Sequence, residues 1–223
     1  MPLTNRKLVV RLVAAIALTV TSFQLSAQQM LEEVIVTAQK REQSLQDVPI
    51  SVSAFSGAAL QESGIKDVFD LQSNTPGLTI DQNQNNTTSN FSIRGVGTGG
   101  NNFGQESSVG LYVDGVYRSR QSSMINQLVD MASVEVLRGP QGTLFGRNTL
   151  SGAVQFNTVA PDHEGTAFLE ATVGNYDLLN LSGAASFSAI DNVLAFRVTG
   201  FSSQRDGWIE NIALDTSDEI YDR

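Results

Sequence analysis

The chain has 223 residues, of which 41% are hydrophobic and 17% charged, with a formal net charge of −9 and no cysteine. An average soluble domain is about 25% charged, so this chain is too apolar and too weakly charged to be disordered. The lack of cysteine excludes disulfide scaffolds, cysteine zinc sites and thiol catalysis, and the acidic excess argues against a nucleic-acid-binding surface.

The first 27 residues have the pattern of a secretory signal peptide. Arg6 and Lys7 give a positive start, residues 12–20 are apolar, and Ser26-Ala27 offers small residues before a cleavage point. A helix needs about 20 apolar residues to cross a bilayer, which is more than this run provides. We therefore expect export of the chain and removal of residues 1–27.

The following residues, 28–47, are polar except for one β-prone patch, Val34-Ile35-Val36. A short stretch of this kind can add as an extra strand to the sheet edge of a partner protein. It can equally be an ordinary first strand of the next domain. The residues alone leave both interpretations open.

Short strand patterns and two helical patterns occupy residues 48–160. The predicted strands are 48–55, 78–80, 91–94, a hairpin over 109–117 that turns at Asp114-Gly115, 133–138 and 153–158. Pro49 belongs at a strand start or at a sheet edge, because proline cannot donate a ladder hydrogen bond. Ser56 is a suitable N-cap for a helix over 57–62, and apolar residues between 65 and 71 recur at helical spacing. This irregular order predicts a small α+β domain.

Residues 82–108 are unusually rich in amides and glycine, with nine Asn or Gln and five Gly. Such a composition is typical of an exposed loop. The run from Gly95 to Gly100 satisfies G-x-G-x-x-G, but no helix pattern follows it, so we do not expect a dinucleotide site.

From residue 165 onward the pattern changes to longer alternating segments, at 165–173, 179–188 and 193–201. One side of each segment is apolar and the other is small or polar. Membrane β-barrel strands have this pattern. An antiparallel sheet with one face in water has it as well.

Several motifs, in their order along the chain, resemble those of the TonB-dependent outer-membrane receptors. The stretch Glu33-Val34-Ile35-Val36-Thr37-Ala38 is similar to the TonB box of that family. Similar to plug segments are Val48-Pro49-Ile50-Ser51-Val52, Phe91-Ser92-Ile93-Arg94-Gly95, Val113-Asp114-Gly115-Val116, residues 134–148 and Ser151-Gly152-Ala153-Val154. The chain departs from the family pattern at Thr149-Leu150-Ser151 and Gln155-Phe156.

The resemblance implies four regions, in chain order: a signal peptide (1–27), a periplasmic TonB-box segment (28–47), an α+β plug domain (48–160) and the first antiparallel strands of a transmembrane β-barrel (161–223). The plug domain is expected to be a small mixed β-sheet with short helices. Residues 165–223 number only 59. A plugged barrel of about 22 strands needs about 220 strand residues, so we expect an incomplete barrel that does not transport by itself.

The resemblance also implies a function: energised uptake of a scarce solute across the bacterial outer membrane, with an iron–siderophore-type complex as first candidate. Its implied partners are the periplasmic C-terminal domain of TonB, the outer-membrane lipid and the solute. Arg94 and Arg138 would make the ionic contact between plug and barrel glutamates. Within the amide-rich loop, the expected solute contacts are Asn101, Asn102, Phe103 and Gln105. No enzyme activity, cofactor, metal site or nucleic-acid binding is expected.

Two alternatives stay open at this point. A soluble periplasmic binding or signalling module could use the plug fold without a pore. A secreted enzyme would have to rely on His163 or Asp114, but His163 lies in a charged linker and Asp114 is accounted for by its hairpin turn.

Overall fold

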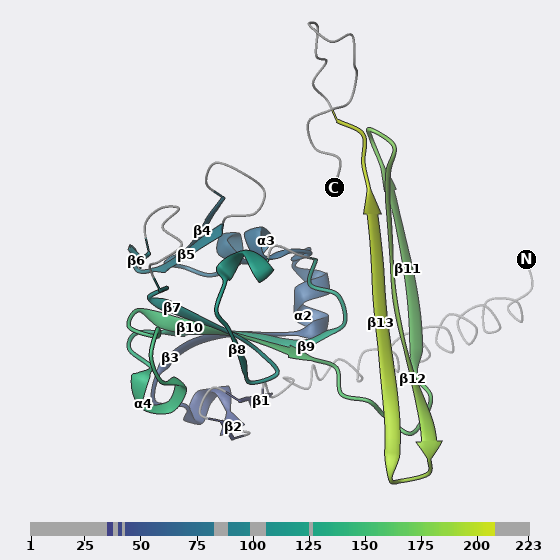
Figure 1. Cartoon of the computed structure of the whole chain (residues 1–223), viewed down its shortest axis with the longest axis horizontal. Helices are drawn as coiled ribbons and strands as arrows, with labels where there is room; N and C mark the ends of the chain where they lie inside the picture. The colour runs from purple at the N-terminus through teal and green to yellow at the C-terminus, as the bar shows by residue number, and fades with distance from the viewer. Residues whose placement is uncertain are drawn as a thin grey trace, which may run out of the picture. The chain divides into compact units, whose positions relative to one another are not determined.

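The computed structural model describes residues 35–37, 40–41, 43–82, 89–98, 106–124 and 127–207 (Figure 1). The predicted signal peptide, residues 1–27, lies outside the described residues. None of the described helices is long and apolar enough to cross a membrane.

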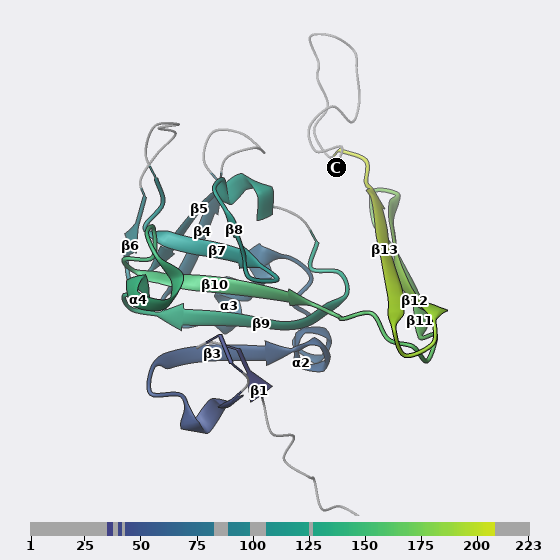
Figure 2. The ribbon, with the colours of Figure 1, turned by 60° about the horizontal axis from the view of Figure 1, so that its bottom comes forward.

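A five-stranded mixed sheet forms the centre of the plug region (Figure 2). Its strands, in spatial order, are β3 (Ser51–Ser56), β9 (Met131–Arg138), β10 (Gly152–Thr158), β7 (Val109–Val113) and β8 (Val116–Arg118). β10 is parallel to β7, and the other neighbours are antiparallel. β3 is an edge strand, in line with the expectation from Pro49.

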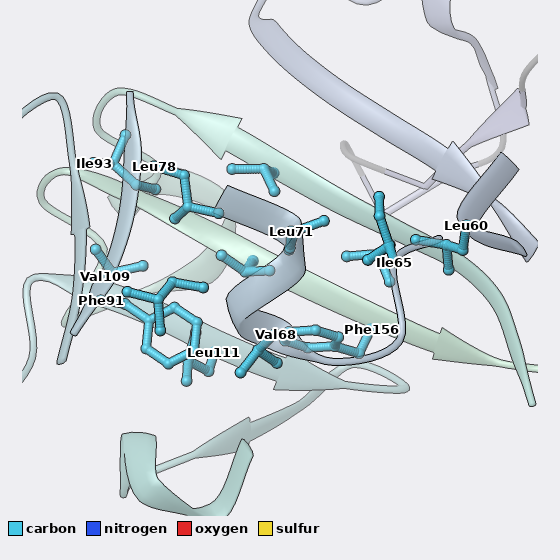
Figure 3. Close-up of a cluster of buried hydrophobic side chains, with 14 residues drawn as sticks. Leu60, Ile65, Val68, Leu71, Leu78, Phe91, Ile93, Val109, Leu111 and Phe156 are labelled. Carbon is cyan, nitrogen blue, oxygen red and sulfur yellow. The ribbon is translucent and has the colours of Figure 1, made fainter. Parts of the chain in front are cut away.

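Two helices and a small antiparallel sheet cover one face of the five-stranded sheet. The helices are α2 (Gly57–Glu62) and α3 (Val68–Asn74), and the small sheet contains β4 (Leu78–Gln82), β5 (Ser89–Ile93) and β6 (Val96–Gly97). Alternate residues of β10, Val154 and Phe156, point into the apolar cluster between these layers (Figure 3). Both are fully buried, so this cluster is the main core of the plug.

The opposite face of the same sheet carries a second, smaller core. It contains Val36, Tyr112, Leu137, Phe145 and Ala153. The elements on this side are β1 (Ile35–Val36), β2 (Gln43–Ser44), the 3₁₀ turn η1 (Leu45–Asp47) and α4 (Gly142–Phe145). The Tyr112 hydroxyl donates to the Phe145 carbonyl at 2.8 Å, which satisfies the polar end of a buried ring.

A second sheet follows the plug and consists of three antiparallel strands. These are β11 (Ala167–Gly174), β12 (Leu178–Ile190) and β13 (Leu194–Gln204). Its apolar side chains are outside: Leu169 is 84% exposed and Val173 is 79% exposed. Ala184 and Ser186, on the other side of β12, are buried. A water-facing antiparallel sheet would show the reverse, so the burial supports the membrane-strand interpretation.

The predicted fold class, an α+β plug followed by the first antiparallel strands of a barrel, is confirmed. The second helix begins at Val68, not at residue 65, because the Asp67 side chain accepts from the Phe69 and Asp70 amides in a capping box. The sequence patterns missed α4 and the short turn η2 (Gln121–Met124).

The loop interpretation of residues 82–108 was wrong for part of that stretch. Residues 89–93 form β5, and Phe91 and Ile93 belong to the fully buried core. The strand predicted over 91–94 lies in this stretch; in the structure it runs over 89–93 and pairs with β4.

Candidate functional site

The described part of the β-prone patch, in the polar segment of residues 28–47, is docked on the plug. β1 pairs antiparallel with β2, with Ile35 opposite Ser44 and Val36 opposite Gln43. The Val36 side chain is fully buried in the smaller core, whereas Ile35 is 57% exposed. Of the predicted TonB box, Glu33, Val34 and Ala38 lie outside the described residues.

A single buried carboxylate holds the next residue, Thr37. The amide and the hydroxyl of Thr37 both donate to Oε1 of Glu135, at 2.8 and 3.0 Å. The Asn157 side-chain amide donates to the same oxygen at 3.2 Å. Burial raises the pKa of Glu135 above its ordinary value, since the loss of hydration outweighs the hydrogen bonds from Thr37 and Asn157.

The energy that holds residues 35–37 is small. Burial of one valine contributes about 1.5–3 kcal/mol. Each hydrogen bond to a charged group adds about 1.5–3 kcal/mol, so the two from Thr37 add about 3–6 kcal/mol. Fixing three backbone residues costs about 3–6 kcal/mol, which offsets most of this gain. The segment is therefore docked with a narrow margin and can be exchanged for another binding mode.

The two predicted arginines, Arg94 and Arg138, meet at one turn. The Arg94 amide donates to the Gly77 carbonyl at 2.7 Å, and Arg138 Nη1 donates to the Pro76 carbonyl at 3.3 Å. Arg138 Nη2 also donates to Ser53 Oγ at 3.0 Å. In the described part of the chain neither guanidinium is in an ion pair. The turn is thus held by the backbone of Arg94 and by the guanidinium of Arg138.

A second charged contact, which the sequence analysis missed, joins the plug to the following sheet. Arg197 of β13 holds Asp130 in a fork, with Nη2–Oδ1 and Nε–Oδ2 distances of 2.6 Å. Thr199 Oγ1 donates to Oδ2 at 2.6 Å. The two charged side chains are only 9% and 4% exposed, respectively. An arginine inside a membrane-type strand is the signal that could have identified it.

The acidic member of this contact is strongly favoured in its charged form. Burial by itself raises the pKa of Asp130, but the hydrogen bonds from Arg197 and Thr199 and the charge of Arg197 outweigh it, so the pKa lies below its ordinary value. Beside Asp130 is a cavity of about 350 Å³. Polar residues of β11 and β12 line it, namely Glu170, Thr172, Asn180 and Ser182. The polar side of this sheet therefore faces the plug.

Comparison with known proteins agrees with this architecture. Residues 44–153 match the family model of the TonB-dependent Receptor Plug Domain. The chain is 33% identical over 198 residues to the pesticin receptor of Yersinia pestis, which covers 86% of this chain and 28% of that protein. It is 26% identical over 192 residues to the iron-regulated outer membrane virulence protein of Vibrio cholerae, covering 78% of this chain and 28% of the relative.

The same relationship is found among solved structures. The ferric yersiniabactin uptake receptor FyuA from Yersinia pestis superposes with a TM-score of 0.69 and 32% identity, over 76% of this chain and 26% of that chain. The chain belongs to the TonB-dependent receptors. It spans 28% of the length of the pesticin receptor. The predicted location in the outer membrane is confirmed by these relatives.

The predicted solute-contact residues of this TonB-dependent receptor, Asn101, Asn102, Phe103 and Gln105, lie outside the described residues. On either side of them, Thr98 and residues 106–108 are joined. The Thr98 hydroxyl donates to the Glu106 carbonyl at 3.2 Å and accepts from the Ser108 amide at 2.9 Å.

The two residues weighed for catalysis have structural contacts. Asp114 has a φ of 48° in the β7–β8 turn and accepts from the Thr158 amide and hydroxyl at 2.8 and 2.9 Å. It ties the hairpin to the end of β10. His163 Nδ1 lies 2.9 Å from Ser188 Oγ on an exposed surface.

Proposed function

We propose that the chain is the N-terminal part of an outer-membrane receptor that takes up an iron–siderophore-type complex with energy delivered through TonB. Relatives named for such ligands support the iron assignment: a hemin receptor of Yersinia pestis and a ferripyoverdine receptor of Pseudomonas aeruginosa. The domain limits given above, with the plug at residues 48–160, are part of this proposal.

The observation that carries the proposal is the narrowly docked segment of residues 35–37. A strand-forming peptide that pairs only with the two residues of β2 can leave the plug and add to the sheet edge of the TonB C-terminal domain. In this scheme residues 33–38 are the TonB-binding segment. Outer-membrane lipid contacts the exposed apolar side of β11–β13, and the solute contacts Asn101, Asn102, Phe103 and Gln105.

The turn at Pro76-Gly77 has a place in the same scheme. Arg94 and Arg138 would pair there with acidic groups of barrel strands beyond those described. Such pairs would fix the plug in the lumen while staying breakable.

The experiment is a binding measurement between the full chain in detergent and the purified TonB C-terminal domain. We expect complex formation with the unaltered chain and at least a tenfold loss for Val36→Pro, because proline removes a ladder donor. Gln46→Pro, in the exposed first turn of η1, is the matched control and should bind normally. Equal binding by both variants would refute the role of residues 33–38.

The alternative, a soluble periplasmic module, is separated by fractionation. Exposed apolar side chains such as Leu169 and Val173 favour a product that needs detergent for extraction. Release of the whole product by osmotic shock would favour the soluble module.

A further inference from the structure

Two buried polar atoms beneath the docked segment have no hydrogen-bond partner among the described residues. They are Glu135 Oε2 and Gln155 Nε2. Glu135 and Gln155 stand directly opposite each other on β9 and β10, and both side chains are buried. They lie on the sheet face of the smaller core, which residues 35–37 cover. Burial of the Glu135 carboxylate costs hydration, and the donors of Thr37 and Asn157 on its other oxygen offset part of that cost.

The other oxygen of Glu135 holds the segment in place. Thr37 contacts it through both its amide and its hydroxyl, across 98 residues of sequence. Asn157 orients this pair: its side-chain amide donates to Glu135 Oε1, to Thr37 Oγ1 and to Ser133 Oγ, at 3.2, 3.2 and 2.9 Å. The attraction of Glu135 for the segment is thus concentrated on one carboxylate oxygen.

We propose that Glu135 is the positioning residue that holds residues 35–37 on the plug and sets how often they are free to pair with a partner strand. The proposal rests on the proposed function of that segment. Docking replaces the water around Glu135 with two donors of Thr37, and release returns the water to both carboxylate oxygens. Docking and release of the segment therefore exchange Thr37 and water as hydrogen-bond donors to the Glu135 carboxylate.

The absence of cysteine from the chain allows a direct test. In a Val36→Cys parent, a single thiol replaces a fully buried side chain of similar size, and its rate of alkylation reports how often the segment is released. We expect Glu135→Leu to raise this rate at least tenfold, because the Thr37 donors lose their acceptor. Glu135→Gln keeps an oxygen acceptor and should stay within about threefold of the parent.

A general loosening of the plug is separated by a second reporter. Val154→Cys places the single thiol in the main core, on the other face of the sheet. Its alkylation rate should not change when Glu135→Leu is added. If both thiols accelerate by the same factor, Glu135 merely stabilises the fold and the proposal is overturned.

Thr37, the donor to Glu135, provides a second site for substitution in the same contact. Thr37→Val removes the hydroxyl donor but keeps the amide, so its rate increase should be smaller than that of Glu135→Leu. Combined with Glu135→Leu it should add less than it does alone, since the hydroxyl has then already lost Glu135 and keeps only its contact with Asn157. Thr79→Val, at an exposed position on β4, is the control for the same chemical change. Fully multiplicative effects of the Thr37 and Glu135 changes would overturn the proposal.

Binding of the TonB domain, measured with Val36 intact, keeps the two proposals apart. A faster alkylation in Glu135→Leu together with no TonB binding would support the positioning role of Glu135 and refute the proposed function. TonB binding together with an unchanged alkylation rate would support the proposed function and refute the positioning role of Glu135.

Discussion

The two sheets of this chain use similar alternating patterns but bury different parts of them. In the plug, β10 is buried on both faces, with Val154 and Phe156 on one side and Ala153 and Gln155 on the other. In β12 the apolar residues Leu181 and Phe187 are exposed, and Ser186 is buried. Alternation therefore shows that a strand has two unlike faces, but the neighbouring layer decides which face is hidden.

The two sheets also differ in what holds them. The plug packs apolar side chains between layers, whereas the second sheet is joined to it through the Asp130–Arg197 fork. The charged contact of the second sheet thus comes from the side opposite its exposed apolar residues. The following predictions test this contrast.

The largest effect is expected from truncation in the plug core. Phe156→Ala should lower the free energy of unfolding by about 3–5 kcal/mol, because it leaves a cavity. Phe187→Ala is the matched change in β12, where the ring is 48% exposed and stacks on Phe196. It should cost about 1 kcal/mol. Urea denaturation of the full chain in detergent measures the free energy of unfolding of both variants. Equal decreases would contradict the claim that apolar burial stabilises the plug more than the second sheet.

The next largest effect is expected at the fork. Arg197→Ala should cost about 3 kcal/mol of unfolding free energy, because it leaves Asp130 buried without its counter-charge. Arg147→Ala removes the exposed ion pair with Glu106, whose side chains are 80% and 54% exposed, respectively. This control should cost less than about 1 kcal/mol. If Arg147→Ala lowers the free energy of unfolding as much as Arg197→Ala, burial of the Asp130–Arg197 pair does not increase its contribution to stability.

Acidification should weaken the same contact by a smaller amount. The pKa of Asp130 lies below its ordinary value of 3.8, so its contribution is complete above that pH and is lost as the pH falls through the folded-state pKa. The free energy of unfolding, followed from pH 7 to about pH 3, should fall more steeply for the unaltered chain than for Arg197→Ala. Identical slopes would contradict the assignment.

The smallest effect concerns the N-cap of α2. Ser56 Oγ accepts from the Ala59 amide at 3.2 Å, so Ser56→Ala should cost about 1 kcal/mol. Ser202→Ala, at an exposed position of β13, should change the free energy of unfolding by less than about 0.5 kcal/mol. A larger cost at Ser202 would show that local contacts matter equally in both sheets.

Local chemistry made much of the fold predictable from sequence. Asp114 and Gly115 both adopt positive φ, 48° and 77°, which is what a two-residue hairpin turn requires. Ser56 caps its helix as predicted because an N-cap depends only on neighbours along the chain. The motif from Val134 to Asn148 added the family, which local patterns could not supply.

The contacts of the candidate site were far harder to predict. Thr37 and Glu135 are 98 residues apart, and Asp130 and Arg197 are 67 apart. No periodicity links residues at such separations, since their meeting depends on strand order and on which face of a sheet is covered. Whether the β-prone patch lies on its own plug or on a partner also depends on a balance of a few kcal/mol that composition does not reveal.

The edge position of β3 has a mechanical consequence. The leader enters the five-stranded sheet at Ser51, which stands opposite Arg138, the last residue of β9. Tension on the leader therefore loads the pair at Ser51 and Arg138 before any pair of the inner strands. The Arg138 side chain donates to Ser53 Oγ and to the Pro76 carbonyl beside that pair. These hydrogen bonds therefore resist separation of the edge strand β3 from β9.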